Sequence, residues 1–219
     1  HSDYLKCKLQ SKGVNNAVHV EYPRFQTLAF EPKKAKAYWN LKTDIPVIAC
    51  LGNTRYDKGI DILLNALSKV KVPFQLLVAG KSAYFDVDFI QKKIALYRDS
   101  VRLHLEYLSD EEMALAVSAA DLVVLPYRKV FDGASGPMVD GVALGKVIVG
   151  PDHGNLGYTI NKNHLGYTFH SEDEVSLAQA IEKALLEPFE KDSVYKAYQQ
   201  ALNLEHFRKG YERVYEKLR

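Results

Sequence analysis

From residue 46 onward, short apolar runs alternate with longer stretches in which apolar residues recur every three or four positions. The short runs are apolar throughout, as in Leu122-Val123-Val124-Leu125. Strands of this kind are covered on both faces, whereas amphipathic helices bury one side only. Six such strands alternating with helices predict an α/β fold with a doubly wound, six-stranded parallel sheet of the Rossmann-like type. The predicted strands are 46–52, 75–80, 101–107, 122–127, 147–150 and 166–170, and the predicted helices are 57–70, 86–98, 110–119, 137–144 and 172–187.

The stretches on either side of this alternating region follow no such pattern. Residues 2–12 predict a helix that ends at Gly13, and residues 18–20 predict a short strand. A basic helix near residues 34–41 leads into the sheet, and we expect Trp39 to anchor it there. The chain therefore divides into a connecting segment with one helix (1–44), the alternating domain (45–190) and terminal helices (191–219).

Composition excludes several functional classes. Hydrophobic residues make up 47% and charged residues 26% of the chain, which is ordinary for a soluble globular protein. The formal net charge of +2 is too small to indicate a nucleic-acid partner or binding to a strongly anionic membrane. No apolar run approaches the roughly 20 residues that a membrane-spanning helix needs. No His, Asp or Glu cluster has the spacing of metal ligands.

Two further features concern the origin of the chain. Cys7 and Cys50 lie far apart, and Cys50 falls within an apolar run, which predicts a buried reduced thiol and a cytosolic protein. The chain starts at His1 without a methionine, and we interpret it as a fragment of a longer protein.

In an open parallel sheet, ligands bind beyond the carboxyl ends of the strands where the strand order reverses. For the common order 3-2-1-4-5-6, this crevice lies between the first and fourth strands. The first of these is followed by Gly52-Asn53-Thr54-Arg55-Tyr56-Asp57-Lys58-Gly59 and then a helix. A guanidinium and an ammonium at a helix N-terminus are typical of a site for phosphate oxygens. The alternative is a solvated loop in which Asp57 caps the helix.

The loop after the fourth strand contains Asp132-Gly133-Ala134-Ser135-Gly136-Pro137. A turn of small residues directs backbone amides toward an anion, and Pro137 suits the first turn of a helix. Asp140 follows eight residues after Asp132. If residues 137–144 are helical, Asp140 faces the mouth of the crevice one turn into that helix. Taken alone, two carboxylates so spaced are more often a cap and a surface charge.

These motifs resemble the C-terminal, donor-binding domain of retaining glycosyltransferases of the GT-B fold, family 4 type (group 1). The resemblance covers roughly residues 44–187, with a Gly…Arg…Lys-Gly loop after the first strand and an acidic-x7-acidic element after the fourth. It implies one half of a GT-B architecture, in which residues 45–190 bind a nucleotide sugar. It also implies that the helices of residues 191–219 pack toward an N-terminal domain.

The resemblance also implies roles for individual residues. Arg55 and Lys58 would hold the donor diphosphate, and Asp132 would face the sugar hydroxyls, so we count these three as catalytic. Asp140 would contact the ribose hydroxyls. The other donor-binding positions would be Gly52, Tyr107, Leu108, Gly133, Ala134, Ser135 and Gly136. Both acidic positions are glutamates in the family, and an aspartate is one methylene shorter. Either the contacts with ribose and sugar are lost, or the helix sits closer to the ligand.

The function that follows from the resemblance is transfer of a sugar from a nucleoside diphosphate donor to an acceptor hydroxyl, with retention of the anomeric configuration. No cofactor or metal is expected. The acceptor, a saccharide or a lipid-linked molecule, would meet the N-terminal domain, in the cytosol or at the cytosolic face of a membrane. Without that domain, these 219 residues would bind donor but transfer no sugar. The alternatives are an epimerase or phosphorylase of similar fold and a non-catalytic domain that binds sugar nucleotides or acts as a scaffold.

Overall fold

The computed structural model describes residues 2–25 and 28–216. Its strands are β1 (Val47–Leu51), β2 (Gln75–Ala79), β3 (Val101–His104), β4 (Leu122–Val124), β5 (Val147–Pro151) and β6 (Gly166–Phe169). They form one sheet in the order β3-β2-β1-β4-β5-β6, and every neighbouring pair is parallel. β1 pairs along its full length with β2, and Ile48 and Ala49 align with Leu122 and Val123 of β4. The predicted doubly wound parallel sheet is therefore confirmed.

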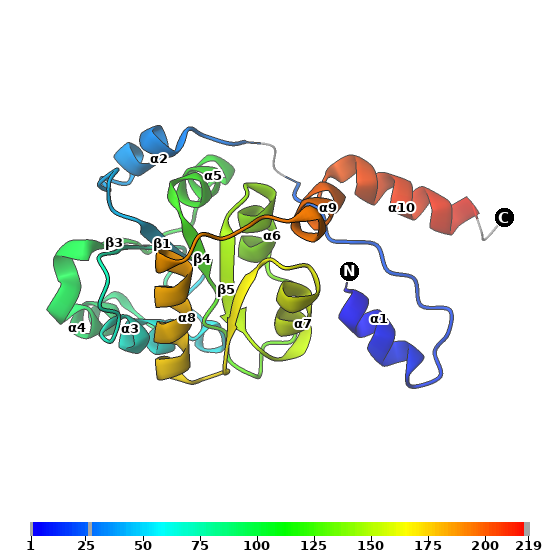
Figure 1. The fold of residues 1–219 in the computed structure, drawn as a ribbon, viewed down its shortest axis with the longest axis horizontal. Helices are drawn as coiled ribbons and strands as arrows, with labels where there is room; N and C mark the ends of the chain where they lie inside the picture. The colour runs from blue at the N-terminus through cyan, green and yellow to red at the C-terminus, as the bar shows by residue number, and fades with distance from the viewer. Residues whose placement is uncertain (1, 26–27, 217–219) are drawn as a thin grey trace.

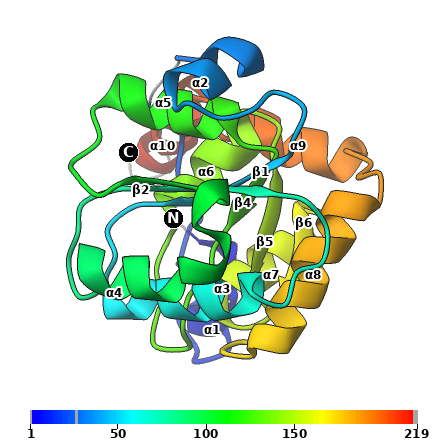
Figure 2. The same ribbon diagram turned by 90° about the vertical axis from the view of Figure 1, so that its left-hand side faces the viewer.

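Helices cover both faces of the sheet (Figures 1 and 2). One face is covered by α3 (Ile60–Leu67), α4 (Val87–Lys93) and α8 (Glu174–Leu186). The other is covered by α2 (Pro32–Tyr38), α5 (Asp110–Ala119), α6 (Gly136–Ala143), α7 (Gly154–Lys162) and α9 (Ser193–Ala201). Short 3₁₀ helices, η1 (Tyr56–Lys58) and η2 (Ala95–Ser100), complete two of the connections.

The strand sequences are apolar throughout because alternate residues of each strand pack into the cores on opposite faces of the sheet. Along β1, Val47, Ala49 and Leu51 pack on the side of α5 and α6, whereas Ile48 and Cys50 pack on the side of α3 and α8. This alternation is the geometry of a pleated strand that is buried on both faces. The Cys50 thiol is buried as predicted, and burial raises its pKa to about 12.

The two ends of the chain run across the same side of the domain, and we call the described residues 2–25, 28–44 and 191–216 the wrapping segments. They include α1 (Asp3–Gln10) and α10 (Leu204–Glu216), which lie beyond the edge of the sheet in Figure 1. The expected strand at 18–20 is wrong, because these residues are irregular chain. A short strand needs a neighbouring strand for pairing, and here Val20 packs against α10 at Gly210 instead.

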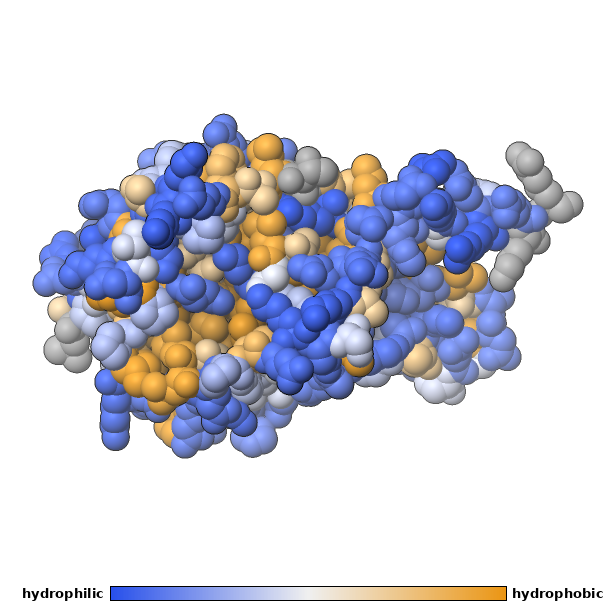
Figure 3. Space-filling model, turned by 45° about the horizontal axis from the view of Figure 1, so that its top comes forward, coloured by the Kyte–Doolittle hydropathy of each residue, from blue (hydrophilic) through white to orange (hydrophobic). Residues whose placement is uncertain are grey.

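The terminal helix α10 carries the apolar stripe that its sequence indicates. Phe207, Tyr211 and Val214 are half-buried, whereas Leu204 and Tyr215 remain 50% and 63% exposed. Leu218 continues the same spacing in the sequence but lies outside the described residues. The outer side of α10 is mostly hydrophilic, as the right-hand part of Figure 3 shows. The helix therefore packs part of its apolar stripe on this chain and leaves the remainder exposed.

Candidate functional site

The strand order reverses between β1 and β4, which lie side by side in the middle of the sheet. The chain leaves β1 toward α3 on one face and leaves β4 toward α6 on the other. Loops that diverge in this way open a crevice beyond the carboxyl ends of the two strands. The structure thus places both loops selected from the sequence at the predicted reversal point.

The two loops touch at Gly59. This residue has a φ of 62°, in the left-handed region, where η1 ends and α3 begins. A Cβ atom at this position would lie 2.1 Å from the backbone oxygen of Pro126. Glycine alone tolerates both the conformation and the close approach. A second link is the Arg128 amide, which donates to the backbone oxygen of Asp57 at 3.0 Å.

The Arg55 guanidinium pairs with a residue of its own loop. Its Nε and Nη2 donate to the two carboxylate oxygens of Asp57 at 2.9 and 2.5 Å. These hydrogen bonds lower the pKa of Asp57, while the Arg55 side chain stays 52% exposed. The N-cap of α3 is Gly59, so Asp57 serves as the partner of Arg55 and not as the helix cap that the alternative interpretation expected.

The Lys58 ammonium lies against two aromatic rings of the loop after β4. Its Nζ is 3.7 Å from the ring centroid of Tyr127 and 4.0 Å from that of Phe131, which is cation–π geometry. Burial lowers the pKa of Lys58 to about 8, and the neighbouring Arg55 cation acts in the same direction. An anion bound nearby would favour the protonated form of this lysine.

The loop after β4 exposes Asp132 and buries Ser135. The Asp132 side chain is 51% exposed and lies 3.9 Å from the Nζ of Lys8 in α1. Ser135 is the N-cap of α6: its Oγ accepts from the Met138 amide at 3.3 Å and lies 3.2 Å from the Tyr127 hydroxyl. The Ser135 side chain therefore holds the start of α6 in place, with the backbone of this loop at the crevice.

A pocket of about 310 Å³ opens at the carboxyl ends of β1 and β2, and we call it the strand-edge pocket. Its lining residues are Tyr22, Pro23, Arg24, Phe25, Gly52, Asn53, Gly80, Lys81, Tyr107, Leu108, Asp110, Met113, Gly136, Val139 and Asp140. It unites five of the residues predicted to bind the donor, namely Gly52, Tyr107, Leu108, Gly136 and Asp140. Tyr107 is 81% exposed at its rim, and Leu108 is buried. The other predicted residues lie in the loops beside it.

Asp140 faces the strand-edge pocket one turn into α6 and is half-buried. Its Oδ1 is 3.5 Å from the Nε of Arg24, a residue of the N-terminal wrapping segment. Burial raises the pKa of Asp140, and the Arg24 cation acts against this shift. The carboxylate that the sequence assigns to the ribose therefore already has a cation beside it.

Sequence reasoning missed several residues of the strand-edge pocket. Asn53 and Lys81 directly follow Gly52 and Gly80, each at the end of a strand, so the rule that placed Gly52 could have found them. Arg24 and its neighbours gave no comparable signal, because they precede the first strand by more than 20 residues. Only the folded chain brings that segment across the crevice.

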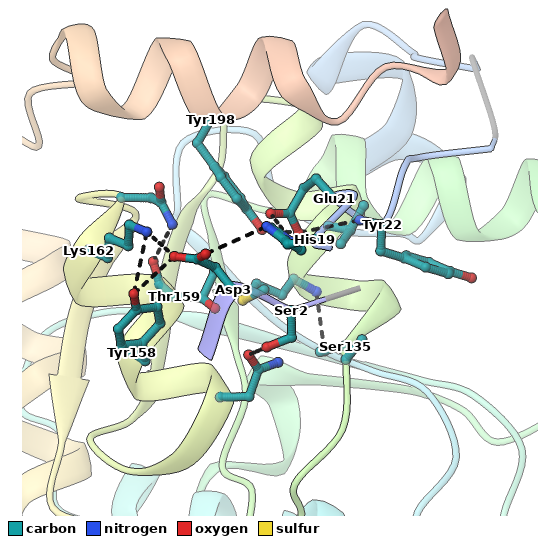
Figure 4. A pocket seen from close by; sticks show the side chains of 15 residues that line it. Ser2, Asp3, His19, Glu21, Tyr22, Ser135, Tyr158, Thr159, Lys162 and Tyr198 are labelled. Atoms are coloured by element: carbon teal, nitrogen blue, oxygen red, sulfur yellow. Dashed lines mark hydrogen bonds and ion pairs between the residues drawn. The ribbon is translucent and has the colours of Figure 1, made fainter. Parts of the chain in front are cut away.

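A second pocket of about 180 Å³ lies between α1, α6 and α7, and we call it the α6–α7 pocket (Figure 4). The predicted residues Ala134 and Ser135 line it on one side. On the opposite side, Asp3 forms an ion pair with Lys162 and accepts a hydrogen bond from the Tyr158 hydroxyl at 3.0 Å. The α6–α7 pocket is thus closed by polar contacts from the start of the described chain.

Within the described part of the chain, no helix has the length and apolarity needed to cross a membrane. The same residues contain no group of three or more His, Cys, Asp or Glu side chains arranged to hold a metal ion.

A family description, Glycosyl transferases group 1, matches residues 45–187. The chain belongs to this family. In this group 1 glycosyl transferase, the matched region begins just before β1 and ends just after α8, so it contains the whole sheet and both loops of the crevice.

Two curated relatives are glycogen synthases. One, from Cellvibrio japonicus, is 27% identical over a match that covers 81% of this chain and 39% of the relative. The other, glycogen synthase 2 of Nitrosococcus oceani, is 28% identical over 64% of this chain and 30% of the relative. The group 1 glycosyl transferase chain thus spans about two fifths or less of the length of these relatives.

Solved structures share the fold. Sucrose-phosphate synthase from Thermosynechococcus elongatus matches with a TM-score of 0.75 and 23% identity, over 99% of this chain and 57% of that one. A glycosyltransferase from Rickettsia africae matches with a TM-score of 0.77 and 18% identity, over 99% and 62%. Anabaena HepE, solved in complex with UDP and glucose, matches with a TM-score of 0.69 and 15% identity, over 87% and 55%. The described sheet is therefore the Rossmann-like half of a GT-B architecture.

Proposed function

We propose that this domain binds a nucleoside diphosphate sugar in the strand-edge pocket and that the whole protein transfers the sugar to an acceptor hydroxyl. The single observation that carries the proposal is the composition of that pocket. Gly52, Gly80 and Gly136 surround it at a strand or helix end, and Asp140 enters it from α6. Glycines allow backbone amides to approach phosphate oxygens closely, and a carboxylate accepts hydrogen bonds from ribose hydroxyls.

In this proposal the nucleotide extends along the pocket from its base to its diphosphate. The base lies near Tyr107 and Leu108, and the ribose lies at Asp140. The diphosphate lies at the start of α6, where the amides of residues 133–136 and the positive end of the helix favour an anion. HepE was solved with UDP and with UDP-glucose, and starch synthase IV of Arabidopsis thaliana with ADP, which supports a ligand of this class.

We propose that the cations of the loop after β1 stabilise the leaving group. Lys58 lies beside the loop after β4, and we propose that it stabilises the charge on the departing diphosphate. Arg55 would join it after giving up part of its contact with Asp57. Asp132 would accept hydrogen bonds from the sugar. Because Lys58 and Arg55 can offset the charge of the diphosphate, we propose transfer without a metal ion. Retention of configuration is proposed from the resemblance of the two loops to those of retaining enzymes of the family.

The remainder of the active site would come from outside these residues. We propose that an N-terminal domain supplies the acceptor pocket, for a saccharide or a lipid-linked acceptor in the cytosol or at the cytosolic face of a membrane. The exposed part of the α10 stripe, with Leu204 and Tyr215, would pack toward that domain. Closure of two domains around a donor excludes water and completes the catalytic groups.

Titration calorimetry on the 219-residue chain tests the first part of this proposal. UDP and ADP would be compared with uridine and adenosine, and at least one diphosphate should bind more tightly than its nucleoside. A scaffold domain without a donor site would bind neither diphosphate, and that result would refute the proposal. Transfer assays on the full-length protein with the matching nucleotide sugar would then test the second part.

A further inference from the structure

The N-terminal wrapping segment contributes four consecutive residues, 22–25, to the strand-edge pocket. A hydrogen bond to the chain just after α9 holds this segment in position. The Arg24 amide donates to the backbone oxygen of Leu202, just after α9, at 2.7 Å. Its Nη2 donates to the backbone oxygen of Leu28 at 2.5 Å. The Arg24 side chain is therefore held at both its base and its tip while it crosses the pocket.

The Nε–H donor of this side chain has no acceptor within the described part of the chain. The Arg24 side chain is only 10% exposed, and its Nε is buried without a hydrogen-bond acceptor among the described residues. The nearest carboxylate oxygen, Oδ1 of Asp140, is 3.5 Å away, whereas a charge-assisted hydrogen bond measures about 2.7–2.9 Å. Buried donors without an acceptor are unfavourable, so this N–H group points to an acceptor supplied by a ligand.

The length of the acidic side chain matters for this arrangement. A glutamate at position 140 would extend the carboxylate by one methylene and could close the distance to Arg24. The aspartate leaves the carboxylate and the Nε–H group loosely paired, with both on the wall of the same pocket. A ribose hydroxyl can both donate and accept a hydrogen bond, so it matches one acceptor and one donor placed side by side.

We propose that Arg24 is a ribose-binding residue of the donor site, where its Nε–H group donates to a hydroxyl oxygen of the ribose while Asp140 accepts from the same diol. This inference rests on the proposed function, because it assumes that a nucleotide occupies the strand-edge pocket. Arg24 lies outside the matched region 45–187, so a residue outside that region would help to determine which nucleotide the pocket binds. In this arrangement Arg24 and Asp140 contact the ribose of the nucleotide and do not contact its phosphates.

The test is titration calorimetry with UDP and ADP and with the 2′-deoxy and 3′-deoxy form of each. Arg24→Gln should weaken binding of the better ribonucleotide about tenfold or more. For at least one deoxy form, the same substitution should change affinity by less than about twofold. Asp140→Asn should abolish the same discrimination, and the double variant should lose little more than either single variant.

Arg98→Gln is the matched control, since it removes the same charge from an exposed position in η2, and it should leave every affinity unchanged. Arg24→Lys is the second test variant, because it keeps the cation but lacks the Nε–H group. It should still bind the diphosphate but lose the preference for ribose over deoxyribose. Circular dichroism of each variant verifies folding. If Arg24→Gln does not fold, the preference of Arg24→Lys for ribose over deoxyribose tests the role of Arg24.

Two outcomes separate this inference from the proposed function. If the unmodified chain binds neither diphosphate, both the proposed function and the role of Arg24 are refuted. If it binds one of them, but substitution of Arg24 weakens ribonucleotide and both deoxynucleotides equally, the proposed function stands and the role of Arg24 is refuted. Equal losses would indicate a general attraction between the guanidinium and the diphosphate. An unchanged affinity in the Arg24 variants would also refute the role.

Discussion

The sheet domain and the two outermost helices of the wrapping segments, α1 and α10, are held in place by different forces. Every residue of β1, β2 and β5 is buried, and the two cores continue into the helices on each face. Within their described residues, α1 and α10 have no buried side chain. α1 is attached by polar contacts, Asp3 to Lys162 and Ser2 to Asn155, and by one ring contact between Tyr4 and Tyr158. The free energy of folding therefore resides mainly in the sheet domain.

The strand-edge pocket nevertheless belongs to both regions. Its floor consists of strand ends and α6, which the family match includes, whereas its open side is crossed by residues 22–25. Substitutions in the sheet domain should thus act on stability first and on binding as a consequence. Substitutions in residues 2–25 and in α10 should have little effect on stability, and those in residues 22–25 should act on ligand affinity.

Gly59→Ala should produce the largest effect. The new Cβ atom would lie 2.1 Å from the Pro126 oxygen at a φ of 62°, and strain and overpacking together should cost about 3–5 kcal/mol. Gly13→Ala is its match in a wrapping segment, with a φ of 86° and no atom within 4 Å among the described residues. It should cost only about 1 kcal/mol. Urea unfolding measures both, and equal losses would contradict the comparison.

Lys58→Ala should strongly weaken diphosphate binding while the domain remains folded. Loss of a charge-assisted contact with phosphate should reduce affinity about tenfold to a hundredfold, with a much smaller effect on the bare nucleoside. Lys93→Ala, at an exposed position of α4, is the control. Calorimetry measures the affinity for both ligands. If Lys58→Ala weakened binding of nucleoside and diphosphate equally, Lys58 would not contact the diphosphate.

The pH dependence of binding should follow the same lysine. Because burial lowers the pKa of Lys58 to about 8, the free protein loses this charge as the pH rises through 8. A bound diphosphate favours the protonated form, so affinity should be highest below pH 8 and decline above it, with proton uptake on binding near pH 8–9. Titrations in buffers of different ionisation enthalpy measure the uptake. An unchanged affinity between pH 7 and 9.5 would show that Lys58 does not sense the ligand.

Arg55→Ala should have a smaller effect than Lys58→Ala. The Arg55 side chain is 52% exposed and already paired with Asp57, so its contact with phosphate replaces an existing ion pair. We expect a loss in diphosphate affinity of about threefold to tenfold. Asp57→Asn should have the opposite sign, because it frees the guanidinium. Weaker binding in both variants would argue that the ion pair itself holds the loop in shape.

Asp3→Ala should have the smallest effect on stability. It removes the ion pair with Lys162 and the hydrogen bond from Tyr158, where the Asp3 side chain is partly exposed and the Lys162 side chain is 48% exposed. The free energy of unfolding should fall by about 1 kcal/mol or less. Hydrogen exchange should instead become faster in the amides of α1 and stay unchanged in β1 and β5. A large fall in global stability would mean that α1 is part of the cooperative core.

The sequence predicted the sheet domain because its signals are local. The apolar runs predicted all six strands, with errors at the ends: 101–107 was predicted where Val101–His104 is observed. The strand order was taken from the common doubly wound sheet, and the structure has that order. The predicted helix 57–70 is divided at Gly59, where the left-handed conformation separates η1 from α3. The wrapping segments were harder to predict, because their positions depend on contacts between residues far apart, such as Arg24 and Asp140.

The position of the bound ligand is the most direct test of this account. Selective ¹⁵N labelling of the 13 glycines allows each amide to be followed by NMR during titration with UDP or ADP. We predict the largest shifts at Gly52, Gly80 and Gly136 around the strand-edge pocket and at Gly133 beside it, with Gly13 and Gly166 unaffected. Shifts confined to other glycines, or no shift with either diphosphate, would contradict the proposed donor site.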